Sequence, residues 1–306
     1  MFLFLILQFA PAAGGLLLAG AWWWLRRRSE PGLPAPVRAA TAVGAVLALA
    51  SALALTAVSV FPEWLPPFDQ EGHLRWLLAR YLIPLIVTFV ALVLLQLPRA
   101  RARGAGTAEL APRTLLTFAP RPLLVATATA ALAAVAAAVL AGAAASTDEL
   151  GRSVRFVLPV SENTYASSTF YGWWFSVPCL VLLALVLVVA GLALRSISRP
   201  PLDVDRSADA AERTIRARNV LAVVIGGVLL HVGAVFSALR ATSMLQTGFD
   251  AGATGFVQFG TSFAALGSAL LVAGWAATLL GSAFWWGVLL STLRSTSRRP
   301  VGSVAR

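Results

Sequence analysis

Residues 172–194, GWWFSVPCLVLLALVLVVAGLAL, form a continuous run without a single charged side chain. About 20 apolar residues in a helix span the hydrocarbon core of a bilayer, so this run is long enough to cross a membrane. The whole chain has the same character, because 58% of its 306 residues are hydrophobic and only 12% are charged. Soluble domains have about 25% charged residues. The sequence therefore predicts an all-α, polytopic integral membrane helical bundle.

Similar runs recur along the chain and predict a single transmembrane domain over residues 1–306 with about seven transmembrane helices. The predicted spans are approximately 3–25, 38–61, 78–97, 123–145, 172–194, 219–243 and 260–292. The first contains Ala10-Pro11-Ala12, which resembles a signal-peptidase site. No basic region precedes it, so we favour a first span over a cleaved signal peptide.

The arginines orient the predicted spans. All 24 basic residues are arginine, and 19 of them lie after the first, third, fifth and seventh spans. The other five are Arg75, Arg80, Arg152, Arg155 and Arg240. Because cytoplasmic loops carry the excess of basic residues, the N-terminus is predicted to be outside and the C-terminus cytoplasmic. The abundance of Ala, Leu, Val, Gly and Arg is typical of a GC-rich bacterial genome, which predicts a bacterial plasma membrane location.

Charge and motifs exclude several classes of partner and cofactor. A net charge of +11 would suggest nucleic acid in a soluble protein, but these arginines flank apolar spans, so the predicted partner is the lipid bilayer and not nucleic acid. The single cysteine, Cys179, lies inside a span and forms no disulfide framework. The chain has no GxxxxGK[ST] motif and no pair of intramembrane histidines for a haem. We predict no cofactor, and energy from ATP would require another chain.

A histidine and an arginine interrupt the apolar run over residues 226–244, GGVLLHVGAVFSALRATSM. His231 lies near the middle of its span, where an ionisable group is a functional candidate as a proton acceptor or ligand contact. The alternative, which we favour, is a packing residue satisfied by one hydrogen bond. Arg240 is nine residues later, about 13 Å along the helix and on nearly the opposite face. It is expected to extend toward the headgroups or to pair with an outer acid such as Asp250.

Proline and glycine mark the predicted bundle in two ways. Pro11, Pro84 and Pro178 lie in the outer parts of three spans and predict helix kinks, which would splay the outer half and open a cavity toward the outside. The alternative is that proline is simply common in membrane helices. A stripe of small residues also recurs every seven positions in the last span and predicts a helix-packing seam, inside the bundle or in a homo-oligomer. Its glycines are Gly260, Gly267, Gly274 and Gly281.

The remaining constellations are weaker. Asp69, Glu71 and His73 alternate in FDQEGHLRW and are weak candidates for a metal site, so we predict no metal. Ser262 or Ser268 with His231 would suggest an intramembrane hydrolase, but no nucleophile motif surrounds either serine.

The many predicted spans, the predicted outer cavity and the arginine-rich loops then favour a permease-like or accessory subunit of a transport system, energised by a cytosolic ATPase or another membrane subunit. The alternative is a non-transporting sensor or scaffold whose outer loop, 146–171, binds a ligand or partner. An enzyme ranks third.

Overall fold

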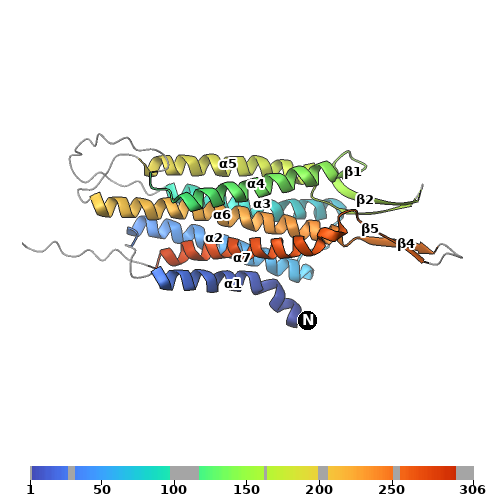
Figure 1. The fold of residues 1–306 in the computed structure, drawn as a ribbon, viewed down its shortest axis with the longest axis horizontal. Helices are drawn as coiled ribbons and strands as arrows, with labels where there is room; N and C mark the ends of the chain where they lie inside the picture. Colours follow the sequence, from blue (N-terminus) through green and yellow to red (C-terminus); the bar gives the residue numbers. More distant parts are fainter. Residues whose placement is uncertain are drawn as a thin grey trace, which may run out of the picture.

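The computed structural model describes residues 2–26, 32–96, 117–161, 164–198, 206–250 and 256–293. Its main feature is a bundle of long helices that run side by side (Figure 1). The long helices are α1 (Phe2–Arg26), α2 (Ala35–Val60), α3 (Gln70–Gln96), α4 (Arg121–Ala144), α5 (Trp173–Ile197), α6 (Arg206–Ser243) and α7 (Gly267–Ser291). Two short 3-10 turns, η1 (Pro62–Trp64) and η3 (Ala264–Leu266), precede α3 and α7.

Six of these helices, α2 to α7, are long and apolar enough to cross a membrane. The chain is therefore a mostly helical, multi-pass membrane protein. The first helix, α1, is 25 residues long but is not among the six, so the seventh span stays a prediction. Figure 1 places the N-terminus at the end of the bundle that carries the β-strands, which we name the sheet end. Which side of the membrane this end faces also stays a prediction, because most of the orienting arginines lie outside the described residues.

Helix α6 is the centre of the bundle. In its most apolar part 72% of the residues are buried, against 17–33% in the other five candidate spans. It packs against α7, α3, α4 and α5, while α1 lies along α7 and α2 lies along α3 and α7. Because lipid offers no hydrophobic drive between helices, such packing depends on close backbone approach. The glycines and alanines of α6 and α7 allow this approach.

The all-α prediction missed five short strands at the sheet end (Figure 1). β1 (Ser146–Thr147), β2 (Ser153–Ser161) and β3 (Thr164–Thr169) form an antiparallel sheet in that order. β4 (Gln246–Asp250) and β5 (Phe256–Gly260) form a separate antiparallel pair. The loop predicted over 146–171 is thus folded. Val154 is buried in β2, whereas the residues that follow it from Arg155 to Leu158 are only partly buried, so the strand has no clear period-2 pattern in the sequence.

The predicted limits of three spans were wrong, one because of a strand and two because a helix continues into polar sequence. The last span was placed at 260–292, but residues 256–260 pair with 246–250 and α7 begins only at Gly267. Helix α3 begins at Gln70 instead of 78, and α6 begins at Arg206 instead of 219. In both cases polar residues continue a helix beyond its apolar part, since hydropathy marks the apolar part alone.

Candidate functional site

A cavity of about 210 Å³ lies among α1, α2, α3, α6 and α7. It reaches from Arg240, close to the sheet end of α6, to Trp285, deep in α7. Two of the predicted kink residues, Pro11 of α1 and Pro84 of α3, line it. Pro178 lies inside α5, which contributes no residue to the lining. Proline in a helix removes a backbone hydrogen bond and crowds the preceding turn, so both lining prolines favour space between neighbouring helices.

Two arginines give this cavity its charge. Arg80 of α3 and Arg240 of α6 both line it, and no acidic residue does so among the residues that the structure describes. Neither guanidinium has a hydrogen bond or an ion pair with any described residue. The cavity therefore carries two positive charges without a described counter-ion.

The rest of the lining is mixed. Thr56, Ser59 and Thr278 donate their hydroxyl hydrogens to carbonyls of their own helices, which leaves oxygen lone pairs as acceptors. Deeper in, the buried indole of Trp285 has no acceptor for its Nε1–H among the described residues. Apolar side chains such as Leu271 complete the lining, so the cavity offers cationic, polar and apolar surface together.

His231 lies on a different side of α6 from this cavity. It is 3% exposed, and its Nδ1 is 2.9 Å from the carbonyl oxygen of Tyr81 on α3. A carbonyl only accepts, so Nδ1 donates, and the Nε2 of a neutral ring can accept from the Tyr171 hydroxyl at 3.5 Å. Pro84 leaves the carbonyl of Arg80 without a helical donor, and His231 binds the next carbonyl along. This geometry suits a packing residue that joins α6 to α3 beside Pro84.

His231 and Arg240, the two polar residues noted within one predicted span, are therefore not brought together. Arg240 faces the cavity, and the side chain of Asp250, its suggested partner, lies outside the described residues. The suggested hydrolase pairs are not assembled either. Ser262 and Ser268 are exposed, whereas both ring nitrogens of buried His231 are engaged by tyrosines.

The glycine stripe lies against α6 over part of its length. A Cβ added to Gly281 would lie 2.9 Å from the carbonyl oxygen of Gly226, and one added to Gly274 would lie 3.4 Å from Cβ of Phe236. Gly267 begins α7, and a Cβ added to it would lie 3.0 Å from the hydroxyl oxygen of Ser243. Gly260 belongs to β5 and meets nothing within 4 Å, so the stripe that α7 presents starts at Gly267.

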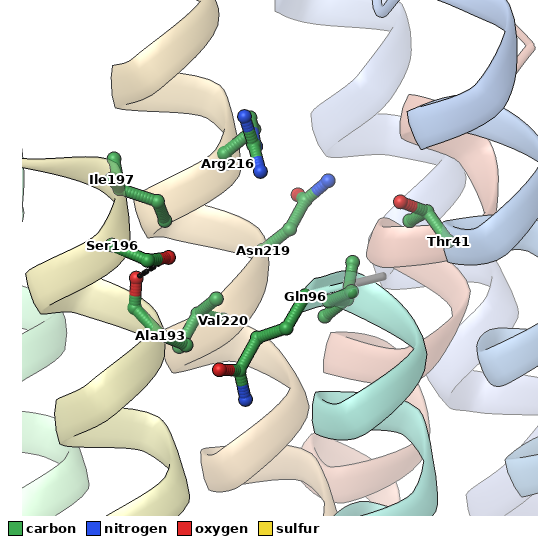
Figure 2. A pocket seen from close by; sticks show the side chains of 9 residues that line it. Thr41, Gln96, Ala193, Ser196, Ile197, Arg216, Asn219 and Val220 are labelled. Atoms are coloured by element: carbon green, nitrogen blue, oxygen red, sulfur yellow. Dashed lines mark hydrogen bonds between the residues drawn. The ribbon is translucent and has the colours of Figure 1, made fainter. Parts of the chain in front are cut away.

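A second polar pocket lies at the opposite end of the bundle, which we name the far end. It encloses only about 10 Å³, roughly room for one water. Figure 2 shows Arg216 and Asn219 of α6, Gln96 of α3 and Thr41 of α2 around it. Asn219 donates to the Ser291 hydroxyl at 3.1 Å, and Arg216 lies 3.8 Å from Glu212.

One turn away at the far end, Arg213 is 5% exposed and lies over the ring of Phe118. It bonds to the Ile197 carbonyl at the end of α5 and to Asp209 at 2.7 Å. Cationic side chains at a helix C-terminus satisfy its last carbonyls. Arg213 and Arg216 are therefore matched by acceptors of the protein itself.

The weak metal candidates have other partners or none. Glu71 bonds to Arg152 at 2.6 Å and to Arg75 at 3.2 Å, and Asp69 accepts the Gly72 amide. His73 is exposed, and no group of three metal-ligating residues occurs within the described ranges. Arg152, which directly precedes β2, also bonds to Asp148 at 2.9 Å, and its bond to Glu71 ties this sheet to α3. Burial raises the pKa of the Asp148 carboxyl, but hydrogen bonds from Arg152 and the Leu150 amide outweigh it and leave that pKa below its ordinary value.

No family model, curated protein or solved structure matches this chain. The site must therefore be argued from its residues. Arg240 was a sequence candidate, but Arg80 was counted only among the arginines outside the cytoplasmic loops. A signal for Arg80 existed, because it lies inside the predicted span 78–97 and four residues before Pro84.

Proposed function

We propose that this protein is a permease-like or accessory subunit of a transport system, in which a solute occupies the cavity lined by Arg80 and Arg240. The observation that carries the proposal is a cavity within a membrane bundle that is lined by charged and hydroxyl groups. Buried charge is costly in a membrane and is retained mainly where it faces water, a partner group or a substrate. Energy comes from a separate partner, because the sequence has no nucleotide-binding loop.

Water access to the cavity tests the first part of this proposal. Thr278→Cys places a thiol in the cavity eleven residues from the start of α7, and Leu132→Cys places one twelve residues from the sheet end of α4. Leu132 is 68% exposed on the outside of the bundle, so it is a lipid-facing control of similar depth. The parent chain sets the background, because its only cysteine, Cys179, is buried.

In phosphatidylcholine nanodiscs both ends of the protein meet the reagent, so the result does not depend on orientation. A hydrophilic maleimide should label Thr278→Cys about tenfold faster than Leu132→Cys, because the thiolate that reacts forms only where water enters. Equal, background-level labelling of both variants would show a dry cavity and would end the proposal of a solute site.

The second part of the proposal concerns the energy source. Purification of the full chain from its native membrane should yield a stoichiometric partner whose sequence contains GxxxxGK[ST]. If the chain is isolated alone and still moves solute into vesicles on addition of ATP, the proposal of a separate energising partner is wrong.

A second candidate function is a sensor or scaffold, favoured by the folded sheet over 146–171. This sheet is fixed to the bundle by Arg152 and by contacts of Phe156 with Phe170 and Phe263. Tyr165 on β3 is 63% exposed, so a photoreactive amino acid at this position reports on partners at the sheet end. Crosslinking there to one defined protein, together with a dry cavity, would favour the sensor.

A further inference from the structure

We propose that the cavity binds an amphiphilic anion, with its phosphate, sulfonate or carboxylate group between Arg80 and Arg240 and its apolar part toward Leu230 and Trp285. This inference rests on the proposed function, because it assumes that a solute enters the cavity. It adds the chemical class of that solute.

The anionic end follows from the charge of the lining. Arg80 and Arg240 come from different helices, line one cavity and have no carboxylate partner among the described residues. Each guanidinium offers a planar fork of donors that matches the oxygens of a phosphate or carboxylate. At the far end the same helix pairs Arg213 with Asp209 and Arg216 with Glu212, so of these three arginines of α6 only Arg240 has no carboxylate partner among the described residues.

The apolar end follows from the deeper lining. From Arg240 toward the middle of the bundle the cavity is bordered by Leu230 and then by Trp285. The indole of Trp285 is 1% exposed, and its Nε1 lies against α6, where a Cβ added to Gly226 would be 2.8 Å away. Leu230 and Trp285 therefore offer apolar surface at this depth. A small, fully hydrated anion would leave the deeper surface uncovered.

Protection of Thr278→Cys from the maleimide measures occupancy of the cavity. Three probes are compared in phosphatidylcholine nanodiscs: octyl phosphate, octanol and inorganic phosphate. Octyl phosphate should slow labelling about tenfold at saturation, whereas octanol lacks the anion and inorganic phosphate lacks the tail, so neither should protect at the same concentration. Equal protection by octanol would overturn the anionic part, and equal protection by inorganic phosphate would overturn the apolar part.

Variants assign the effect to the two arginines. Arg80→Gln and Arg240→Gln should each raise the octyl phosphate concentration for half-protection by roughly tenfold, the usual loss for one charge-assisted hydrogen bond. Arg155→Gln removes one positive charge from β2, outside the cavity lining, and should leave protection unchanged. Labelling without probe shows that each variant retains a wet cavity. An equal effect of all three variants would indicate nonspecific attraction and would overturn the site.

A last arm distinguishes the sources of the anion. In nanodiscs that contain phosphatidylglycerol, protection without added probe would identify a bilayer lipid as the occupant. Protection by octyl phosphate alone would identify an amphiphile that arrives from water. Rapid labelling of Thr278→Cys with no protection by any probe or lipid would overturn this inference while leaving the proposed function standing. A dry cavity would contradict both this inference and the proposed function.

Discussion

The two ends of α6 use arginine in opposite ways. At the far end Arg213 and Arg216 have carboxylates four residues before them, Asp209 and Glu212, and the space among the polar side chains is about 10 Å³. At the sheet end Arg240 lines a cavity of about 210 Å³ and has no counter-ion in the described part of the chain. The two ion pairs are internal to α6, and Arg213 also joins α6 to α5 through the Ile197 carbonyl. In the proposed function, the arginine at the other end of the same helix binds a ligand instead of a neighbouring helix.

The contact between α6 and α7 supports both regions, so its disruption should have the largest effect. Gly281→Ala places a Cβ 2.9 Å from the Gly226 carbonyl and should lower the free energy of unfolding by about 1–3 kcal/mol, and Gly281→Leu by more. Gly287 on the same helix meets nothing within 4 Å, so Gly287→Ala should be neutral or slightly stabilising. Thermal unfolding in detergent measures both. Equal stability of Gly281→Leu and the parent would show that the seam is not closely packed.

The next prediction compares the two kinds of arginine directly. Arg213→Gln should destabilise the protein by about 3 kcal/mol, because it leaves Asp209 and the Ile197 carbonyl without their cation. Arg240→Gln should change stability by less than about 0.5 kcal/mol, since no described partner is lost. The same unfolding assay checks both variants. The contrast between the two ends would be wrong if the Arg240 variant were as unstable as the Arg213 variant.

His231 lies between the two regions and should show an intermediate effect. His231→Leu removes the bonds to Tyr81 and Tyr171 and should cost about 1–3 kcal/mol, whereas His231→Gln can keep a donor and an acceptor and should cost less. Because His231 does not line the cavity, labelling of Thr278→Cys should not change in the glutamine variant. A stable glutamine variant without transport activity would instead give His231 a functional role.

The smallest effect should come from the ion pairs that fix β2. The pKa of Asp148 is lowered in the folded protein, so its ionised form stabilises the sheet above the ordinary aspartate pKa of about 3.9. This stabilisation falls as the pH drops through the lower, folded pKa. Asp148→Asn should therefore lower the melting temperature slightly at pH 7, and the difference from the parent should shrink below about pH 4. A difference that is constant from pH 7 to pH 3 would contradict this assignment.

The helices were largely predictable because each needs a long apolar run, and such a run is visible without knowing its neighbours. All six candidate spans overlap runs found in the sequence. The strands were missed because β4 and β5 have only five residues each, and their pairing depends on a partner segment. For the same reason Gly260 was assigned to a helix although it ends a strand.

The candidate site was harder to predict than the fold. Sequence spacing separated His231 from Arg240, and the structure also places them in different surroundings. That Arg80 and Arg240 line the same cavity could not be predicted, because it depends on how α3 and α6 lie beside each other. Nor did the sequence show that Glu71 meets Arg152, since the two are 81 positions apart. Local patterns identify polar residues, but tertiary packing decides which of them face the same space.

The continuity of α6 has a mechanical consequence. Its 38 residues form one rod of about 57 Å, nearly twice the thickness of the hydrocarbon core. No proline interrupts this rod, while α1, α3 and α5 each contain one. A rigid tilt of about 5° around its midpoint would displace each tip by roughly 2.5 Å in opposite directions, given the rise per residue of a helix. Force applied near Arg213 would thus reach Arg240 by leverage, without any change in the helix itself.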